Sequence, residues 1–351
     1  MQNIINIIII NSITVFIIST IIFYFIIYKK NNLLFSFFQK KKDDMKMHSK
    51  PVAQNGGLII IFFFLANLII NLTFFSEINN HFNITSINRH YILFLSLILL
   101  TIISILDYKF KIHPIVRLSV HFFICYISLT LVNFPIIPID ILPLKLQFFI
   151  VCIFWVYVIN ATNFIDGIDG MLSINLLNLI LCIVLTFLLI GIKHSKILYF
   201  ALILLPLILS FLIFNFPKAK IFMGDTGSIP LGYLVGYLLI ELLIEKEYFI
   251  FLTGFLYPLL DVSLTIIRKM INKIYPWARL FDYFFLAPVI KGGLKHSFVL
   301  KRIIGVSLIT ILSNFFINFY NFNYTIFLII IFGLNIYLIY FFNKFRKKKL
   351  N

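Results

Sequence analysis

The chain has 351 residues, of which 61% are hydrophobic and only 12% are charged, and its mean hydropathy is +1.03. A soluble globular protein carries about a quarter charged residues, so the composition excludes a soluble domain and indicates an all-α polytopic integral membrane protein. The formal net charge of +17 follows from basic loops on one membrane face, and we expect no nucleic-acid partner.

Eleven apolar stretches are candidate membrane spans, because a helix needs about 20 predominantly apolar residues to cross a bilayer. The first stretch is too long for the core of a signal peptide and lacks a basic start and a small-residue cleavage site, so we expect it to remain as a helix. No internal repeat or soluble insertion separates the stretches, which predicts a single membrane domain over residues 1–351. The candidate spans are 4–27, 57–76, 90–106, 115–133, 146–160, 172–192, 197–215, 229–244, 248–266, 303–320 and 324–343.

Basic residues set the expected orientation, because Lys and Arg accumulate in short cytoplasmic loops. With the N-terminus outside, the loops after odd-numbered spans are cytoplasmic, and the C-terminus is cytoplasmic too. Those loops contain every Lys and Arg except Arg89, Lys145, Lys193, Lys196 and Lys246. The same orientation places all of the polar clusters described next on the cytoplasmic face, where a basic surface attracts anionic lipid heads or a pyrophosphate.

Polar residues concentrate between Asn160 and Gly170, directly after an apolar run. This stretch contains Asn160, Asn163, Asp166 and Asp169 together with two glycines. Asn and Asp commonly cap helices, but capping explains one of these residues and not all four. Asp166 and Asp169 are three residues apart and would share a face of a helical turn. Ionisable groups beside a bilayer are costly and usually functional, so we favour a functional site.

A second polar stretch, Phe222–Ser228, precedes the eighth span. Its glycines permit close backbone approach, and Asp225 stands at a helix start, where a cap is the simpler explanation. Mg²⁺ typically takes one or two carboxylates and leaves its other positions to water and substrate phosphates, so Asp225 is the candidate metal ligand. Asp107 ends the third span beside Tyr108 and near Lys111, and by itself it is an ordinary helix end.

Three other positions are ambiguous when taken alone. Lys46 and His48 belong to a basic stretch that enters a Gly56-Gly57 turn, and taken alone they are better explained as a solvated charge run beside the membrane. Asp261 lies within the ninth apolar stretch, where a lone Asp is more often functional or paired than idle. His296 is a single histidine in a basic loop, which is more typical of a surface residue.

Together these stretches resemble, in order, the signature blocks of the polyprenyl-phosphate N-acetylhexosamine-1-phosphate transferase superfamily. That superfamily (glycosyltransferase family 4) includes bacterial UDP-GlcNAc:undecaprenyl-phosphate transferases and the phospho-N-acetylmuramoyl-pentapeptide transferase of peptidoglycan synthesis. Asn160–Gly170 is similar to its Asn-Phe-Ile-Asp-Gly-x-Asp-Gly block, and Phe222–Ser228 to its Phe-Met-Gly-Asp-x-Gly-Ser block. Lys46–Pro51 with the following Gly-Gly looks like its first signature, and Pro258–Asp261 like its later Asp-bearing helix. The resemblance covers about residues 46–300.

The resemblance implies an eleven-span enzyme of the bacterial inner membrane with a cytoplasmic active site. It implies transfer of a sugar-1-phosphate from a UDP-N-acetylsugar to a polyprenyl phosphate lipid such as undecaprenyl phosphate, with Mg²⁺ and release of UMP; a homodimer is left open. Asp225 matches the metal ligand, Asp107 the first carboxylate of a catalytic Asp-Asp pair, and Asn163 and Asp166 the nucleotide and catalytic pocket. The expected substrate-binding residues are Lys46, His48, Lys111, Asn160, Asp169, Asp261 and His296.

Two positions depart from the family pattern. The second carboxylate of the pair is here Tyr108, and the family's histidine-rich loop falls in residues 281–292, which contain no histidine. His296 is either a substitute for that motif or a neighbour of it. Asp107 either deprotonates the lipid phosphate or attacks the pyrophosphate covalently, and the sequence leaves both mechanisms open.

Three hypotheses follow. The first is an active transferase that initiates a cell-envelope glycan, with the O-antigen or lipopolysaccharide branch preferred over peptidoglycan. The second is a catalytically impaired family member that acts as a scaffold or regulator of envelope biosynthesis. The third is a transporter that uses acidic residues within the membrane, and it predicts carboxylates deep in the spans or on both faces.

Overall fold

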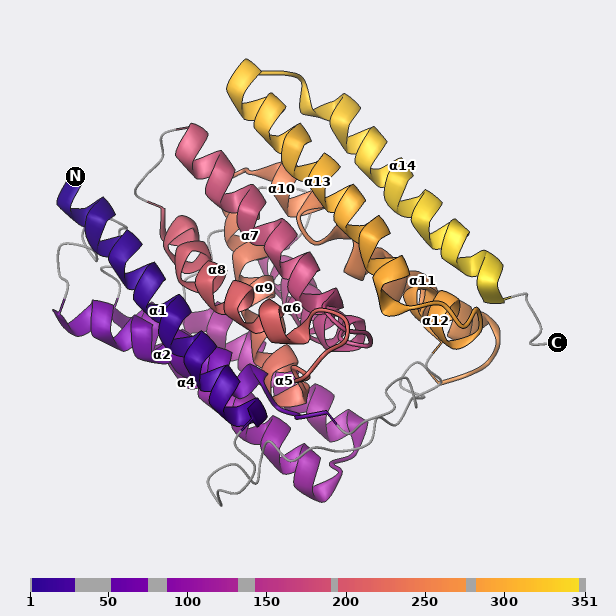
Figure 1. The fold of residues 1–351 in the computed structure, drawn as a ribbon, viewed down its shortest axis with the longest axis horizontal. Coiled ribbons are helices and arrows are strands. Elements are labelled where there is room, and N and C mark those ends of the chain that lie inside the picture. The colour runs from indigo at the N-terminus through magenta and orange to yellow at the C-terminus, as the bar shows by residue number, and fades with distance from the viewer. Residues whose placement is uncertain are drawn as a thin grey trace.

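The protein is a bundle of α-helices, as the composition predicts. The computed structural model describes residues 2–28, 52–74, 87–131, 143–190, 195–275 and 282–346, and these ranges contain no β-strand. The helices are α1 Gln2–Tyr28, α2 Gly57–Phe74, α4 Ile87–Phe110, α5 Pro114–Leu131, α6 Leu144–Ile165, α7 Met171–Leu189, α8 Lys196–Asn215, α9 Asp225–Ile244, α10 Tyr248–Thr253, α11 Leu256–Ile271, α12 Ala287–Ile290, α13 His296–Tyr320 and α14 Tyr324–Asn343, with short 3₁₀ turns η2 Phe284–Leu286 and η3 Lys344–Arg346 (Figure 1).

Eight helices in the described ranges are long and apolar enough to cross a membrane, namely α1, α4, α6, α7, α8, α9, α13 and α14. Two shorter apolar helices, Gly57–Asn71 and Pro114–Thr130, lie within α2 and α5. The prediction of a polytopic all-α membrane protein is therefore confirmed. The count of eleven spans and the orientation remain predictions.

The predicted ninth span, residues 248–266, is wrong as one continuous helix. The chain breaks at Gly254 and Phe255 into the six-residue α10 and the sixteen-residue α11. Pro258 agrees with the restart, because a proline, which has no N–H, is best tolerated in the first turn of a helix. The side-chain amide of Asn178 donates to the Gly254 carbonyl at 2.9 Å, which satisfies an acceptor at the break.

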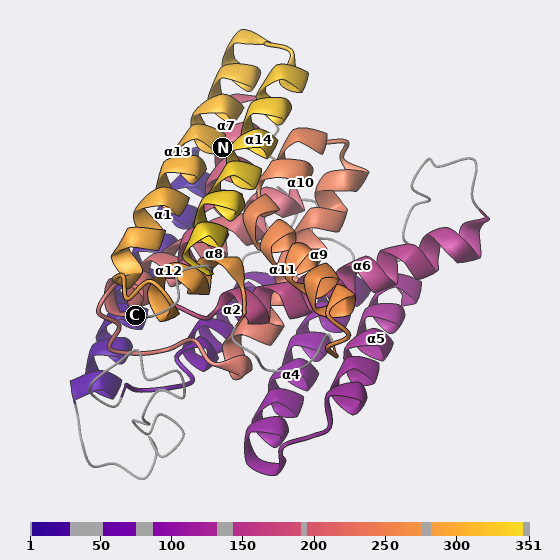
Figure 2. The same cartoon turned by 90° about the vertical axis from the view of Figure 1, so that its right-hand side faces the viewer.

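Helix α9 forms the centre of the bundle and is buried along almost its whole length. It packs against α2, α4, α6 and α8 (Figures 1 and 2). Small residues allow α6 to approach closely, since a Cβ on Gly236 would lie 2.2 Å from Cδ1 of Trp155. The Trp155 ring stacks on Tyr233 and its indole N–H donates to the Tyr233 carbonyl at 2.9 Å. Such close packing is the usual source of helix association in membranes.

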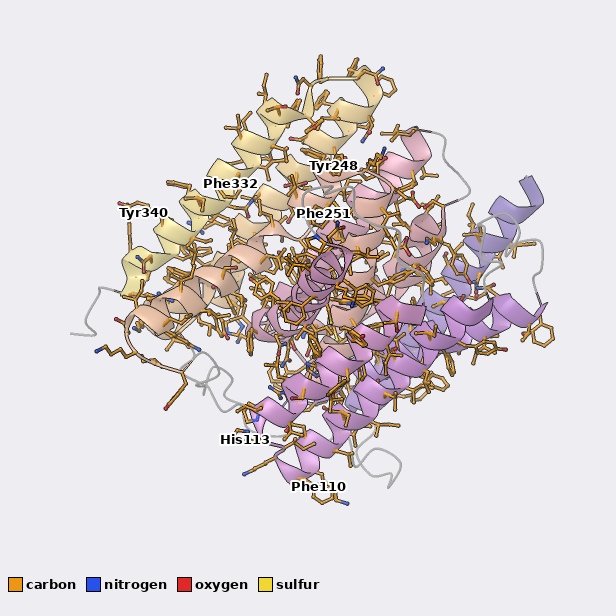
Figure 3. All side chains as sticks on the ribbon, turned by 180° about the vertical axis from the view of Figure 1, so that it is seen from behind. Phe110, His113, Tyr248, Phe251, Phe332 and Tyr340 are labelled. Carbon is orange, nitrogen blue, oxygen red and sulfur yellow. The ribbon has the colours of Figure 1, made fainter. Side chains whose placement is uncertain are left out.

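Outward-facing positions carry large apolar side chains. Phe332 and Tyr340 are exposed on α14, and Phe110 is exposed at the end of α4 (Figure 3). Lipid tails accommodate such side chains as readily as a protein core does. The exposed apolar surface therefore agrees with a membrane environment.

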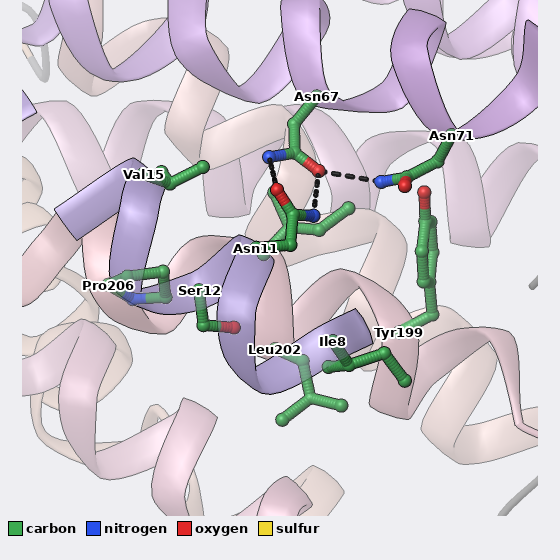
Figure 4. Close-up of a pocket in the computed structure, with 10 residues that line it drawn as sticks. Ile8, Asn11, Ser12, Val15, Asn67, Asn71, Tyr199, Leu202 and Pro206 are labelled. Atoms are coloured by element: carbon green, nitrogen blue, oxygen red, sulfur yellow. Dashed lines mark hydrogen bonds between the residues drawn. The ribbon is translucent and has the colours of Figure 1, made fainter. Parts of the chain in front are cut away.

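An amide network ties α1 to the rest of the bundle. Asn11 and Asn67 exchange two hydrogen bonds of 2.9 and 3.1 Å, and Asn71 donates to Asn67 at 2.6 Å (Figure 4). Ser19 adds a bond of 2.8 Å to Ser210 of α8. Hydrogen bonds between membrane helices contribute on the order of 1 kcal/mol each, so this network fixes the position of an otherwise lightly packed first helix.

Candidate active site

An arginine joins two of the predicted site carboxylates. Nη1 of Arg117 lies 2.7 Å from Oδ2 of Asp107 and 3.5 Å from Oδ2 of Asp225. The Asp107 side chain is 11% exposed and that of Asp225 is 40% exposed, so the group has one buried and one open side. Asp107 and Asp225 come from α4 and α9, and the fold brings them together as the sequence predicts.

The short connection between α4 and α5 positions this arginine. Lys111 has a positive φ of 50° and its N–H donates to the Asp107 carbonyl at 2.8 Å, which ends α4 in a tight turn. Pro114 then begins α5, a position where its missing N–H costs nothing. Arg117 in the first turn of α5 thus faces Asp107. Lys111 itself is exposed at the rim.

The Gly56-Gly57 turn is hydrogen-bonded to the Phe222–Ser228 stretch beside Asp225, although the two are far apart in the chain. The N–H groups of Gly56 and Gly57 donate to the carbonyls of Phe222 and Met223 at 2.8 and 2.9 Å. A Cβ on Gly57 would lie 2.3 Å from Cα of Gly227, so both positions require glycine. Asp225 is therefore held on a backbone that two loops build together.

Asn163 and Asp166 line the same end of the bundle. The hydroxyl of Ser228 donates to Oδ1 of Asn163 at 2.7 Å, which connects the end of α6 to the start of α9. Asp166 follows α6 as its C-cap. Burial raises the pKa of the Asp166 carboxyl well above its usual range, the neighbouring Asp225 raises it further, and a hydrogen bond from the Gly224 backbone opposes this.

Asp169 and His296 meet on the inner side of the site. Nδ1 of His296 lies 3.2 Å from Oδ1 of Asp169 and 3.3 Å from its main-chain nitrogen. Oδ2 of Asp169 accepts the N–H of Ala219 at 2.9 Å. His296 thus joins the predicted cluster although it lies 127 residues from Asp169 in the chain.

Asn160 lies on the wall of a cavity of about 620 Å³ between α5, α6 and α11. Arg117 and Asn160 line the cavity with polar groups, and Phe122, Phe123 and Ile153 are among its apolar lining residues. Phe123 and Ile153 are also exposed on the bundle surface, so the cavity opens sideways toward the expected lipid. It connects an apolar surface with Arg117.

Other predicted site residues are not brought into this cluster. Lys46 and His48 lie outside the described residues. Asp261 is fully buried and its carboxylate accepts hydrogen bonds only from within the protein. That arrangement differs from the substrate contact expected for Asp261 from the sequence.

Sequence reasoning missed Arg117 and Asn215. Arg117 was counted only as a loop charge, although an arginine in the first turn of an apolar helix, ten residues after Asp107, is a usable signal. Asn215 accepts the N–H of Gly170 at 2.9 Å and donates to the Ile221 carbonyl at 2.8 Å. It ends α8 without any motif around it, so only the fold reveals that it links the Asn160–Gly170 stretch to the loop before α9.

The site fits a hard cation that takes few protein ligands. No group of three or more His, Cys, Asp or Glu side chains in the described part of the chain could hold a metal ion. Asp225 is accessible, and Asp166 lies close enough for the two carboxylates to repel each other, a repulsion that a cation would relieve. One or two carboxylates with water and substrate phosphates completing the shell are typical of Mg²⁺.

Comparison with known proteins agrees with these features. Residues 90–243 match the family model described as "Glycosyl transferase family 4". Similar proteins are phospho-N-acetylmuramoyl-pentapeptide-transferases of Leuconostoc mesenteroides (42% identical over 103 residues, 29% of this chain and 31% of the relative), Clostridium beijerinckii (38% over 119 residues, 33% and 34%) and Staphylococcus epidermidis (31% over 145 residues, 40% and 43%). The chain thus spans less than half the length of the curated relatives it matches.

Proposed function

Because this chain belongs to glycosyl transferase family 4 through its residues 90–243, we propose that it transfers an N-acetylsugar-1-phosphate from a UDP-sugar to a polyprenyl phosphate. The reaction takes place at the cytoplasmic face of a bacterial plasma membrane and releases UMP. The product initiates a cell-envelope glycan. The relatives named above act in the muramoyl-pentapeptide branch by name, so UDP-MurNAc-pentapeptide joins UDP-GlcNAc as a candidate donor.

The observation that carries this proposal is the position of Arg117. Its guanidinium contacts Asp107 and Asp225 and also lines the 620 Å³ cavity that opens on the bundle surface. A lipid phosphate has an apolar tail and an anionic head, and these two parts match the apolar wall and Arg117 respectively. Arginine binds phosphate oxygens well because its planar fork donates two parallel hydrogen bonds.

The remaining residues have roles consistent with their contacts. Asp225, with Asp166 beside it, would hold Mg²⁺, which neutralises the charge of the pyrophosphate when bound. Asn163 fixes the α6 end against Ser228, and Asn160 lines the cavity near the head of the acceptor. Asp107 holds Arg117 in place and stands where it accepts any proton left on the lipid phosphate.

The reaction is an in-line displacement at phosphorus. An oxygen of the lipid phosphate forms a bond to the sugar-bearing phosphorus, and the bond from that phosphorus to the UMP oxygen breaks. UMP leaves with the electron pair of that bond. Two anionic substrates repel each other, so preorganised positive charge at Arg117 lowers the cost of bringing them together.

The test is UMP release by membranes that contain the protein, supplied with undecaprenyl phosphate, Mg²⁺ and either UDP-GlcNAc or UDP-MurNAc-pentapeptide. We expect lipid-linked product with one donor, and much less of it in Asp225→Asn at a Mg²⁺ concentration that just saturates the wild-type protein. The matched control is Glu245→Gln, the same chemical change at the opposite end of α9, which retains turnover. Absence of UMP release with both donors would overturn the transferase and favour a scaffold or regulator of envelope enzymes.

A further inference from the structure

Asp261 is a fully buried carboxylate that binds two consecutive main-chain N–H groups. Oδ1 accepts the N–H of Phe284 and Oδ2 accepts that of Phe285, both at 3.0 Å. The hydroxyls of Tyr257 and Thr265 add bonds of 2.9 and 3.4 Å. These four bonds occupy both oxygens, and charge-assisted bonds of this kind are about twice as strong as neutral ones.

The backbone that Asp261 holds is the η2 turn, which precedes α12. It belongs to the stretch 281–292, where the resemblance led us to expect a histidine-rich motif. Phe285 and Leu286 are 0% and 2% exposed, so the turn is a packed wall. A helical turn is normally capped by the residue that directly precedes it. Here the carboxylate comes instead from Asp261 of α11.

The wall lies directly against the Asn160–Gly170 stretch. A Cβ on Gly167 would lie 2.9 Å from Cζ of Phe285 and 3.5 Å from Cδ2 of Leu286. Tyr283 stacks on Phe164 and on Phe285, with ring centroids 5.7 and 5.9 Å apart. Phe285 therefore limits where the backbone beside Asp166 can lie.

Ion pairs of the neighbouring Asp282 hold the same turn in place as well. Asp282 pairs with Arg268 at the end of α11 and with Arg346 of η3. Both guanidinium groups lie over the Phe284 ring, at 5.2 and 4.0 Å from its centroid. The turn is thus held at its main chain by Asp261 and at its side chains by two arginines.

We propose that Asp261 is a positioning residue of the active site, which holds the η2 turn so that Phe285 fixes Gly167 and thereby the Asp166 carboxylate. The inference rests on the proposed transferase function for its effect on turnover. In place of a histidine-bearing loop, the chain presents buried aromatic side chains behind the turn that carries Asp166, and Asp261 of α11 holds them there.

Asp261→Asn is the first test, because the amide keeps the shape but turns an NH₂ toward one of the two main-chain N–H groups. We expect turnover per folded molecule to fall by about tenfold or more, because misplacing a reacting group by about 1 Å can cost that much or more. Size-exclusion elution and thermal unfolding in detergent establish the folded fraction. Wild-type turnover in folded Asp261→Asn would overturn the proposal.

A double-mutant cycle separates positioning from general destabilisation. Gly167→Ala forces a Cβ onto Phe285, so we expect it to lose most turnover in the wild-type background. Phe285→Leu should restore part of that loss, and Gly167→Ala should cost much less in the Asp261→Asn background, because the wall can then move. Gly305→Ala, whose added Cβ would meet nothing within 4 Å, is the control. An equal cost of Gly167→Ala in both backgrounds would contradict the coupling.

A readout independent of activity distinguishes this proposal from the transferase itself. Leu286→Cys is expected to resist maleimide in the wild-type background and to become labelled when Asp261→Asn is added. The native Cys125, Cys152 and Cys182 are buried, which keeps the background low. If wild-type membranes release no UMP but the labelling changes as expected, the transferase proposal fails and the anchoring by Asp261 stands. Equal labelling of Leu286→Cys in both backgrounds would refute the proposal that Asp261 holds the η2 turn.

Discussion

Nη1 of Arg117 lies 2.7 Å from Oδ2 of Asp107, in a site where the family pattern leads one to expect a second carboxylate at Tyr108. The arginine also reaches Asp225 at 3.5 Å. Positive charge therefore lies between two carboxylates of different helices. With Tyr108 in place of that carboxylate, one arginine faces two negative charges here, whereas an Asp-Asp pair together with Asp225 would give three.

Replacement of Arg117 should impair turnover strongly. Arg117→Ala is expected to lower kcat/KM for the lipid acceptor by about 100-fold, the usual scale for removing one preorganised donor from a transition state. Arg117→Lys keeps the charge but loses the planar fork, and it should be intermediate. The measurement is UMP release at varied undecaprenyl phosphate. Arg302→Ala, which removes a guanidinium stacked on Phe298, is the control, and equal effects of the two alanine variants would refute a special role for Arg117.

Metal removal should stop the reaction reversibly. We expect EDTA to abolish UMP release and Mg²⁺ to restore it, with Ca²⁺ a poor substitute because Mg²⁺ demands tighter octahedral geometry. Asp225→Asn should raise the Mg²⁺ concentration for half-maximal rate by about tenfold or more, given the loss of a charged ligand. The rate is measured across a Mg²⁺ titration with Glu245→Gln in parallel. Full activity in EDTA would show that no divalent cation is needed.

Glycine substitutions should separate the close α6–α9 contact from the lipid-facing surface. Gly236→Ala places a Cβ 2.2 Å from the Trp155 ring, and such overpacking typically costs about 1–3 kcal/mol. Gly333→Ala on α14 meets nothing within 4 Å and should leave stability unchanged or raise it by up to about 1 kcal/mol through helix propensity. Thermal unfolding in detergent compares them, and the same melting temperature for both would argue against the contact.

Stability should depend on pH through Glu245 at the end of α9. Burial raises the pKa of Glu245, and Glu241 and Glu247 raise it further, while the Ser195 hydroxyl and Lys196 lower it. Because the folded pKa exceeds the unfolded one, the folded state favours the protonated carboxyl, and stability falls as pH rises through this range. Glu245→Gln should therefore raise the melting temperature at pH 7 and leave it unchanged near pH 4. A lower melting temperature at pH 7 would mean that the carboxylate is net stabilising.

The residues that could be predicted from the sequence are those whose placement near a bilayer is energetically unfavourable. Asn163 and Asp166 were identifiable because polar groups near a bilayer need a reason, and Asp225 because glycines surround it. Apolar length likewise predicted ten helices that the structure contains as single elements. Hydropathy is insensitive to a local backbone break, so the interruption at Gly254 was missed.

The remaining parts depend on contacts between distant segments, which no local pattern encodes. Asp261 was recognised as unusual, but its partners are the main-chain N–H groups of Phe284 and Phe285, and main-chain groups have no sequence signature. His296 resembled a surface residue until α13 was seen to place it beside Asp169. In both cases the residue type drew attention in the sequence, but its partner could be identified only from the structure.

The contact between Gly57 and Gly227 has a consequence for how the chain is made. The backbone acceptors for Gly56 and Gly57 lie at Phe222 and Met223, immediately before α9. While the first helices enter the membrane, those N–H groups must therefore stay solvated or use temporary partners. The end of the site that holds Asp225 therefore forms only after α9 has been made, and not while α2 enters the membrane.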